Sequence, residues 1–317
     1  MPQLNHTDSS RAPGGRRGFT LVELLVVVVM ISILMGALTA LFLSQQRFYG
    51  DISELASVRR ELRAGASILP LDIRGISGPG NDIAAASATS LTLKAPVGSA
   101  VICEIAPDRR SFHIFPTNLV ANTLSSFWTE PLPTDSIFIF DDGPGSGAED
   151  DEWRRHSIGS VGSSSACDVG STPYTTLAAD DAGSRPRTQV TLGGGATLQP
   201  HIEVGSVVRF TRLMEYELYQ PGSGTGWYIG MRENLDGSWS DLSPVSGPYR
   251  APAQGGVQFA YLDTLGAAVT GSSAADLARI ARVDVTMRAS GREARSFGFS
   301  GPITDSLFLS VGIRNFR

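Results

Sequence analysis

The sequence predicts an α+β protein, in which one long N-terminal helix packs on an antiparallel β-sheet head. A long apolar run lies close to the N-terminus, and apolar residues at helical spacing follow it. Beyond residue 80 the pattern changes to short β-branched and aromatic segments separated by turn residues. A long helix followed by a succession of strands favours the segregated α+β architecture.

The composition is that of a globular protein and argues against one class of partner. The 317 residues are 42% hydrophobic and 18% charged, which is ordinary for globular chains. The 35 glycines indicate many turns and so favour β-structure over a helical bundle. The net charge of -5 argues against nucleic acid as a primary partner, because phosphate binding needs a basic face.

The first fifty residues contain a polar leader and a segment long enough to cross a membrane. Residues 1–18 hold three arginines and no apolar run, whereas residues 19–43 are almost wholly apolar. No charged residue lies between Leu24 and Leu43, and twenty helical residues span about 30 Å, the thickness of a bilayer's hydrocarbon core. The arginines predict that the N-terminal side stays in the cytoplasm. We therefore expect a cytoplasmic leader at 1–18 and a transmembrane helix at 19–43.

Glu23 distinguishes between the possible interpretations of this segment. A secretory signal peptide would have a shorter apolar region and a small-residue cleavage site after it, and a plain signal anchor would not need a carboxylate. A carboxylate in an apolar helix costs about 3 kcal/mol at the bilayer centre, and less near an end, so it marks a functional site. If the chain is cut between Gly18 and Phe19, the new amine lies about 6 Å along the helix from Glu23. Glu23 could pair with that amine or with the amine of a neighbouring subunit.

The residues from Arg17 to Glu23 resemble the cleavage and N-methylation signal of type IV pilins and of the pseudopilins of type II secretion. Basic residues, glycine, phenylalanine, Thr-Leu and glutamate precede a long apolar run, as they do in that signal. The resemblance implies that a prepilin peptidase cuts after Gly18 and methylates the amine of Phe19. It also implies that Glu23 guides docking into a growing filament whose core the apolar helices form.

The predicted helix continues beyond the membrane as an amphipathic segment over 44–80. Its apolar residues recur at steps of three or four, as on one face of a helix; they are Phe48, Ile52, Leu55, Val58, Leu62, Ala66, Leu69 and Ile73. One helix over 19–73 would be about 80 Å long. Pro70 should kink this helix or mark its last turn, and the glycines from Gly75 onward should end it.

The remainder, 81–317, is expected to be an extracytoplasmic β-rich head. Strand-like segments are 90–95, 100–105, 111–115, 136–140, 188–192, 204–219, 226–231, 257–263, 281–289, 294–300 and 306–315. Their spacing suggests antiparallel meanders with one face exposed to water. Residues 141–187 are rich in Gly, Ser and Asp and are expected to form one long loop.

Two cysteines, Cys103 and Cys167, lie in the part of the chain expected outside the cytoplasm, where a disulfide could persist. A bridge between them would close a loop of about 65 residues and stabilise the fold by roughly 3–4 kcal/mol in the chain-entropy treatment. The sequence leaves open whether the two thiols pair, because it does not give the distance between their Cα atoms.

The head shows no pattern that predicts catalysis. Its histidines, His113, His156 and His201, lack metal-ligand spacing, and two cysteines so far apart make no zinc motif. The glycine-rich stretches do not join a strand to a helix in the manner of a phosphate-binding loop. The acidic residues of 141–152 could bind calcium but lack EF-hand spacing, so a solvated acidic loop is expected. We therefore predict a protein that is not an enzyme and that has no metal or cofactor.

The resemblance extends into the head and implies a minor subunit. Residues 66–78 are similar to the helix end of PilW-type minor pilins and of J-type minor pseudopilins, and the length of the head favours the PilW-like type. The implied function is a minor type IV pilin that helps to initiate pilus assembly with other pilins on an inner-membrane platform and sits near the tip. Its head would be periplasmic before it enters the pilus.

Two alternatives to the minor pilin stay open. One is a minor pseudopilin of a type II secretion system, which would share the processing signal and the apolar helix. The other is a membrane-anchored binding module that never polymerises, in which case Glu23 would be replaceable.

Overall fold

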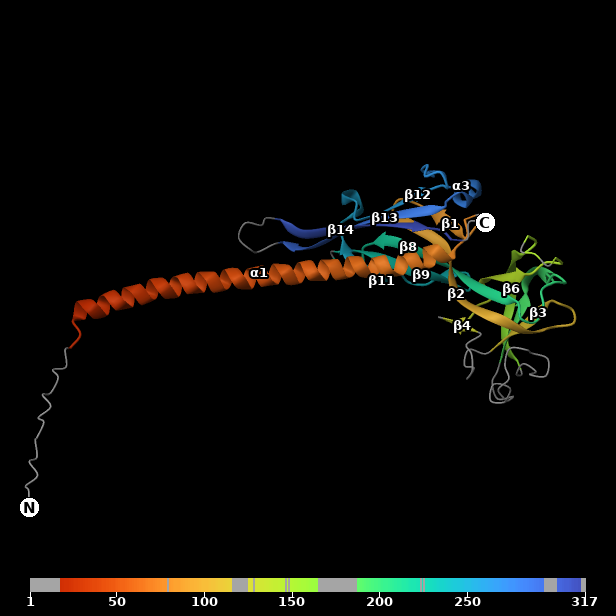
Figure 1. Ribbon diagram of the computed structural model, residues 1–317, viewed down its shortest axis with the longest axis horizontal. Helices are drawn as coiled ribbons and strands as arrows, with labels where there is room; N and C mark the ends of the chain where they lie inside the picture. The colour runs from red at the N-terminus through yellow and green to blue at the C-terminus, as the bar shows by residue number, and fades with distance from the viewer. Residues whose placement is uncertain are drawn as a thin grey trace, which may run out of the picture. The chain divides into compact units, whose positions relative to one another are not determined.

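The computed structural model contains one long helix and a large antiparallel β-sheet, which confirms the predicted α+β class (Figure 1). The chain divides into two compact units, one made of Met1–Ser53 with Glu293–Gly301 and the other of Glu54–Arg292 with Pro302–Arg317. The structure describes residues 18–78, 80–115, 125–127, 129–145, 147, 149–164, 187–222, 224, 226–293 and 301–314.

Helix α1 runs over Leu21–Gly75, close to the predicted bounds. Pro70 lies inside the helix, which continues to Gly75 before the chain turns. The turn is closed by a side chain, because the backbone N–H of Ser77 donates to Oδ2 of Asp82 at 2.8 Å. Asn81 adopts a positive φ of 56°, a conformation that asparagine tolerates better than most residues. Turn chemistry after Gly75 therefore ends the helix, rather than the proline.

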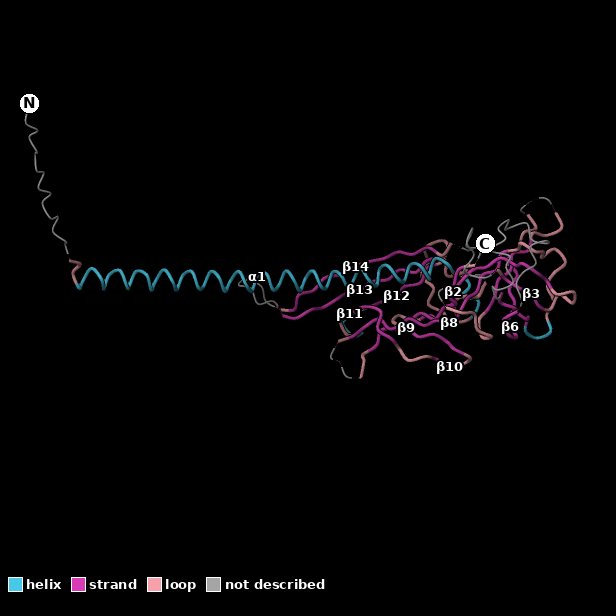
Figure 2. Tube along the Cα trace, turned by 90° about the horizontal axis from the view of Figure 1, so that it is seen from below, coloured by secondary structure: helices cyan, strands magenta, loops and turns pink. Residues whose placement is uncertain are grey.

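One face of the C-terminal part of α1 is buried against the sheet. The buried residues are spaced by three or four positions, as helical periodicity requires; they are Val58, Leu62, Gly65, Leu69 and Ile73. Figure 2 shows this part of the helix running alongside strands of the sheet. Arg59 reinforces the contact, since its Nε donates to Oδ2 of Asp305 at 2.8 Å. The predicted stripe packs from Val58 onward, whereas Phe48 and Ile52, before it, are exposed.

Gly65 allows the helix to approach the sheet closely. A Cβ atom built on it would lie 2.8 Å from both Oγ of Ser246 and the hydroxyl of Tyr249. These two groups hydrogen-bond each other at 2.6 Å, and burial raises the pKa of Tyr249 to about 12. The hydroxyl therefore stays protonated at physiological pH, and the polar pair beneath the helix is satisfied.

The strands that follow the helix form one 14-stranded sheet. They are β1 (Ile83–Ala86), β2 (Ser90–Ile105), β3 (Ser111–Ile114), β4 (Ser126–Phe127), β5 (Ser136–Asp141), β6 (Glu152–Ser164), β7 (Arg187–Leu192), β8 (Val207–Tyr219), β9 (Trp227–Leu235), β10 (Ser238–Trp239), β11 (Ser243–Tyr249), β12 (Val257–Leu262), β13 (Arg282–Glu293) and β14 (Pro302–Gly312). A short helix, α3 (Ala274–Ala278), and the 3-10 turns Gly193–Gly195 and Pro252–Gln254 interrupt them.

Strand β8 is shared between a closed ring of strands and an open sheet. Its first residues pair with β2 on one side and with β5 on the other, and its later residues pair with β2 and β9. Antiparallel pairings from β2 through β3, β7, β6 and β5 return to β8 and close the ring. Beyond β9, strands β11, β13 and β12 continue the open sheet, which α1 covers. The topology is therefore more complex than the predicted meander.

The expectation of one loop over 141–187 is wrong for Glu152–Ser164, which form strand β6. This strand is polar and contains two glycines, so its local sequence gives little strand signal. It is nevertheless paired along its length, with β5 at its start and with β7 at its end. Pairing with β5 and then with β7 overrides the weak intrinsic strand preference of these residues. Strand prediction from local sequence fails where such pairing decides the structure.

Other differences from the expected strands are smaller. The segments expected at 90–95 and 100–105 form one strand, β2, whose register shifts between Pro96 and Gly98. Strands β1, β4, β10 and β11 and helix α3 were not expected, and all except β11 are five residues or shorter. The strand expected at 294–300 lies outside the described residues.

A buried ion-pair network ties β8 to the neighbouring loop and to β9. The Arg212 and Asp135 side chains are 2% and 0% exposed, and Nε and Nη2 of the arginine donate to the two carboxylate oxygens at 2.9 and 3.1 Å. The remaining guanidinium nitrogen Nη1 donates to Glu233 at 2.9 Å, and Nη2 also donates to the Glu130 carbonyl at 2.8 Å. Because these charges are desolvated, each depends on the partner that compensates it.

Replacing Arg212 by methionine should destabilise the protein by about 3–5 kcal/mol, because Asp135 would be left buried and unpaired. Urea unfolding of the full chain in detergent micelles, followed by tryptophan fluorescence, measures this. Arg279→Met is the matched control, since Arg279 pairs with Asp263 at the surface and should cost no more than about 1 kcal/mol. Equal destabilisation by the two variants would contradict the importance of the buried network.

Asp72 and Tyr216 form a polar contact between the last turns of α1 and strand β8. The Tyr216 hydroxyl donates to Oδ2 of Asp72, and the tyrosine is fully buried. Burial raises the pKa of the Asp72 carboxyl, and the hydrogen bond from Tyr216 opposes this shift. The folded protein therefore binds the Asp72 proton more tightly than the unfolded chain does. The contribution of Asp72 to the free energy of unfolding is therefore full below the unfolded pKa of 3.8. It is lost as the pH rises through the higher pKa of the folded protein.

Asp72→Asn should be more stable than the wild type near neutral pH, because asparagine removes the buried charge and still accepts the Tyr216 hydrogen bond. The difference should shrink as the pH falls toward the unfolded pKa of 3.8, because Asp72, whose folded pKa is raised above that value, itself becomes protonated. Thermal unfolding of both proteins across this range tests the sign. Tyr216→Phe, which leaves the carboxylate without its donor, should instead cost roughly 1.5–3 kcal/mol at neutral pH. Asp72→Asn less stable than the wild type at neutral pH would refute the assignment.

Candidate functional site

The start of α1 brings together the residues expected to be processed and to guide assembly. Residues 18–20 precede the helix, and Leu21 is its first residue. The backbone N–H of Glu23 donates to Oγ1 of Thr20 at 3.2 Å, and the N–H of Leu24 donates to the Thr20 carbonyl at 3.2 Å. Thr20 is therefore the N-cap of the helix, and Glu23 stands at the third helical position.

Thr20 and Glu23 have the spacing of a capping box, in which a threonine N-cap is followed three residues later by glutamate. The sequence analysis missed this feature, although the spacing alone could have revealed it. A carboxylate in the first turn also interacts favourably with the helix dipole, by about 0.3–1 kcal/mol. Glu23 therefore has a role within its own chain in addition to any role in assembly.

The first half of α1 presents an apolar surface that no other described part of the chain covers. Its apolar side chains from Phe19 to Leu43 are exposed, Phe19 by 79%. An 18-residue window of the helix has a mean hydropathy of 2.8, and none of it is buried. By length and composition α1 can cross a membrane, and such an N-terminal helix is typical of the membrane anchoring of pilins.

Polar side chains in this apolar stretch are satisfied by the helix backbone. Ser32 Oγ donates to the Val28 carbonyl at 2.7 Å, and Thr39 Oγ1 donates to the Met35 carbonyl at 2.7 Å. A hydroxyl that bonds the preceding turn does not leave an unsatisfied donor in a lipid environment. The two side chains are therefore compatible with a membrane.

Small residues recur every fourth position along the same stretch; they are Ser32, Gly36, Ala40 and Ser44. A Cβ atom added to Gly36 would meet nothing within 4 Å. Glycine inside a helix costs about 1 kcal/mol relative to alanine, and no contact within the described chain requires it here. Spacing of this kind lets helices approach closely in membranes.

The other residues singled out from the sequence lie apart from this segment. Cys103 lies in β2 and is disulfide-bonded. The second cysteine, Cys167, lies outside the described residues, so a bridge between the two, which the sequence leaves open, stays a hypothesis. Burial lowers the pKa of His113 and of His156, whereas His201 is exposed. Within the described ranges, no three His, Cys, Asp or Glu side chains group as metal ligands would.

The acidic stretch is partly structural rather than wholly solvated as expected. Asp141 is buried at the end of β5, where Nε of Arg154 donates to its Oδ2 at 2.5 Å. Asp150 accepts a hydrogen bond from the backbone N–H of Gly145 at 2.6 Å. These carboxylates therefore hold the connection between β5 and β6.

The comparisons with known proteins identify the N-terminal segment. A family model described as the prokaryotic N-terminal methylation motif matches residues 14–39. No curated protein and no solved structure matches the chain. The motif, together with the apolar helix and the antiparallel sheet, supports a type IV pilin-like protein that is processed from a prepilin. The motif implies processing by a prepilin peptidase and assembly with other pilins.

Proposed function

We propose that this protein is a minor type IV pilin, a structural subunit that helps to initiate pilus assembly. The observation that carries the proposal is the prepilin motif over residues 14–39, which includes the start of an apolar helix that is exposed among the described residues. A large β-rich part follows the helix, and its length supports a minor subunit that takes few positions in a filament, including positions near the tip. The same motif supports a structural role rather than catalysis.

Processing would create the charged group that Glu23 needs. In the proposed mechanism a prepilin peptidase cuts between Gly18 and Phe19 and methylates the new amine. Phe19 lies directly before the N-cap Thr20, so the amine would stand at the positive end of the helix and one turn from Glu23. In a bundle of staggered subunits, the same amine can face the Glu23 carboxylate of a neighbour.

The relevant magnitudes favour pairing over capping as the main role of Glu23. A carboxylate in an apolar helix costs on the order of 3 kcal/mol at the bilayer centre and less near its edge. Favourable interaction with the helix dipole returns about 0.3–1 kcal/mol. A nearby cation would offset the rest of the cost of placing the carboxylate in the apolar helix. The amine that processing creates on Phe19 is such a cation.

Close packing of helices would then form the filament core. The small residues at positions 32, 36, 40 and 44 leave one side of α1 without large side chains, so that another helix can approach its backbone closely. Apolar attraction alone does not bring helices together in lipid, so close van der Waals contact across small residues supplies the driving force. Before assembly, the N-terminus would be cytoplasmic and the head periplasmic, with one crossing of the inner membrane.

The second candidate is a minor pseudopilin of a type II secretion system. The motif at residues 14–39 and the apolar helix are compatible with either machine. A membrane-anchored binding module that never polymerises is the third candidate, and it differs in requiring no charge at Glu23.

Glu23→Gln separates assembly from capping, because glutamine can serve at the third position of a capping box but carries no charge. We expect normal processing. The amount recovered in sheared filaments should fall at least about tenfold, because a loss of about 1.4 kcal/mol of pairing free energy corresponds to a factor of ten. Immunoblots of filament and membrane fractions measure the distribution, and N-terminal sequencing checks processing.

Thr20→Val is the matched control for the capping role, because it removes the capping hydroxyl and keeps the Glu23 charge. When its processing is normal, this variant should assemble far better than Glu23→Gln. If Glu23→Gln enters filaments as the wild type does, the anchored binding module replaces the pilin.

Ala40→Leu should reduce recovery in filaments by severalfold, because it places a large side chain on the side of α1 that otherwise lacks them. Leu38→Trp adds a comparable volume at a similar membrane depth but on the opposite side of the helix, and it should assemble normally. Both variants should be found in the membrane fraction at wild-type levels. Equal recovery of the two variants would show that the small residues do not form a packing surface.

A further inference from the structure

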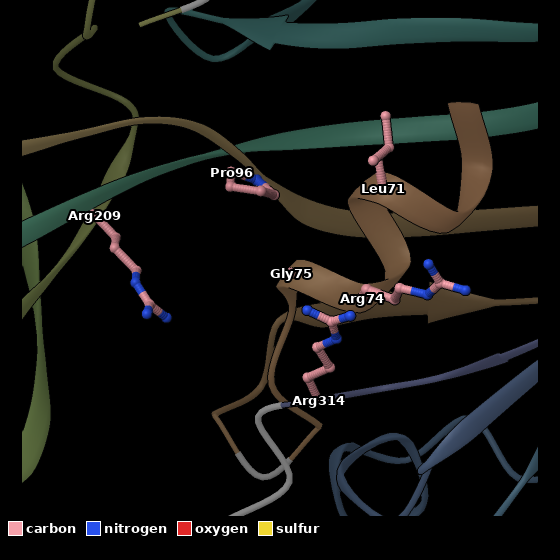
Figure 3. A pocket seen from close by; sticks show the side chains of 6 residues that line it. All are labelled: Leu71, Arg74, Gly75, Pro96, Arg209 and Arg314. Carbon is pink, nitrogen blue, oxygen red and sulfur yellow. The ribbon is translucent and has the colours of Figure 1, made fainter. Parts of the chain in front are cut away.

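Three arginines surround a hollow beside the end of α1, within the unit that contains the sheet. The hollow has a volume of about 460 Å³ and is lined by Leu71, Arg74, Gly75, Pro96, Arg209 and Arg314. Figure 3 shows Arg209 extending from β8 toward the side on which Arg74 and Arg314 lie. The arginines come from α1, from β8 and from the residues after β14, so the fold rather than the local sequence brings them together.

These three arginines gather around one hollow and have no carboxylate partner among the described residues. Arginines such as Arg59, Arg154 and Arg232 form ion pairs. None of the described residues forms an ion pair with Arg74, Arg209 or Arg314, and no carboxylate of a described residue lines the hollow. In a chain with a net charge of -5, this is a local concentration of unneutralised positive charge.

Arg209 is held in place by aromatic side chains. Its Cζ atom lies 4.0 Å from the centre of the Trp153 ring, and Trp153 packs edge-on against Phe140 with the ring centres 5.3 Å apart. Cation–π contact orients the guanidinium without using its N–H donors. Burial lowers the pKa of Arg209, but a guanidinium remains charged under all physiological conditions. The donors are therefore oriented in advance and free to bind a ligand.

The negative end of the α1 dipole works against anion binding here but is too weak to prevent it. A helix C-terminus carries an effective charge of roughly -0.5. Arg74, Arg209 and Arg314 line the same hollow and carry three full positive charges, and Figure 3 shows the Arg74 side chain extending away from Arg209. Net attraction for an anion remains after the dipole is counted.

We propose that this hollow binds an acidic peptide segment of a partner protein, with aspartate or glutamate side chains next to an apolar residue. Guanidinium forks match carboxylates in geometry and bind them through paired hydrogen bonds. Leu71, which is 59% exposed, and Pro96 supply an apolar wall beside the charges. That wall favours a peptide with an apolar side chain over a small inorganic anion. The site extends beyond the proposed function, because it concerns recognition by the head and does not need the processed N-terminus.

A neighbouring hollow gives the site a second, acidic part. It shares Gly75, Pro96 and Arg209 with the first hollow and is also lined by Asp82, Asp151 and Glu152. Glu152 forms an ion pair with Arg154 at 3.1 Å and none with Arg209. Asp82 is buried, and its Oδ1 has no hydrogen bond among the described residues. A bound peptide that carries a basic residue beyond its acidic ones would match both parts.

The experiment measures binding of a fluorescent peptide to the full chain in uncharged detergent micelles. The probe is a short peptide of alternating aspartate and leucine, and fluorescence anisotropy gives its Kd. We expect saturable binding that weakens about tenfold in each of Arg74→Gln, Arg209→Gln and Arg314→Gln, the effect of one lost charged hydrogen bond. Arg63→Gln, an exposed arginine on the same helix away from the hollow, should bind as the wild type does.

Two further probes test the chemistry that the site requires. A peptide of alternating asparagine and leucine should not bind, because it lacks charge, and one of aspartate and serine should bind at least severalfold more weakly than the first probe. The proposal is overturned if no saturable binding occurs or if Arg63→Gln weakens it as much as the three variants do. It is also overturned if the serine peptide or inorganic phosphate binds as tightly as the aspartate–leucine probe, since the hollow would then be a general anion site.

Discussion

Helix α1 has to satisfy two different surroundings along its length. From Val58 to Ile73 its apolar side chains fit against a sheet of the same chain, and Gly65 lets the backbones approach closely. From Leu24 to Leu43 its apolar side chains are exposed. Burying apolar surface gains about 25 cal/mol per Å², so leaving this stretch in water would cost a large free energy. The protein is therefore stable only where lipid or neighbouring helices cover that stretch, and this requirement links the fold to assembly.

The chain treats charges that lie in its core or in its apolar stretch in two ways. In the head, Arg212 is matched by Asp135 and Glu233, and Asp72 receives a hydrogen bond from Tyr216. Glu23, in the apolar stretch, has no side-chain partner among the described residues. Charges that are matched within the chain stabilise the fold, whereas charges that lack a partner point to something outside it. The three arginines around the hollow at the end of α1 likewise lack a carboxylate partner among the described residues, and their donors can bind a carboxylate ligand.

Local sequence predicted the features that depend on local chemistry. The apolar run, the helical stripe and strands such as β3, β5 and β8 follow from periodicity, and the candidate processing residues follow from a short motif. Strand β6 was missed because its polar residues become a strand through pairing with β5 and β7. The closed ring, the Arg212 network and the arginine hollow join residues far apart in sequence, and no pattern within one segment reveals them. Thr20 is different, since its capping role with Glu23 was readable from their spacing.

The measurement that most directly tests the account is intact-mass and N-terminal analysis of the protein purified from its native membrane. The account predicts a mature chain that begins at N-methylated Phe19 and lacks residues 1–18. A Gly18→Lys variant, in which the residue before the cut is changed, should keep the leader and stay in the membrane. A wild-type chain that keeps its leader, or one cut after the apolar run at Leu43, would contradict the central claim, because neither would carry the new amine that Glu23 requires.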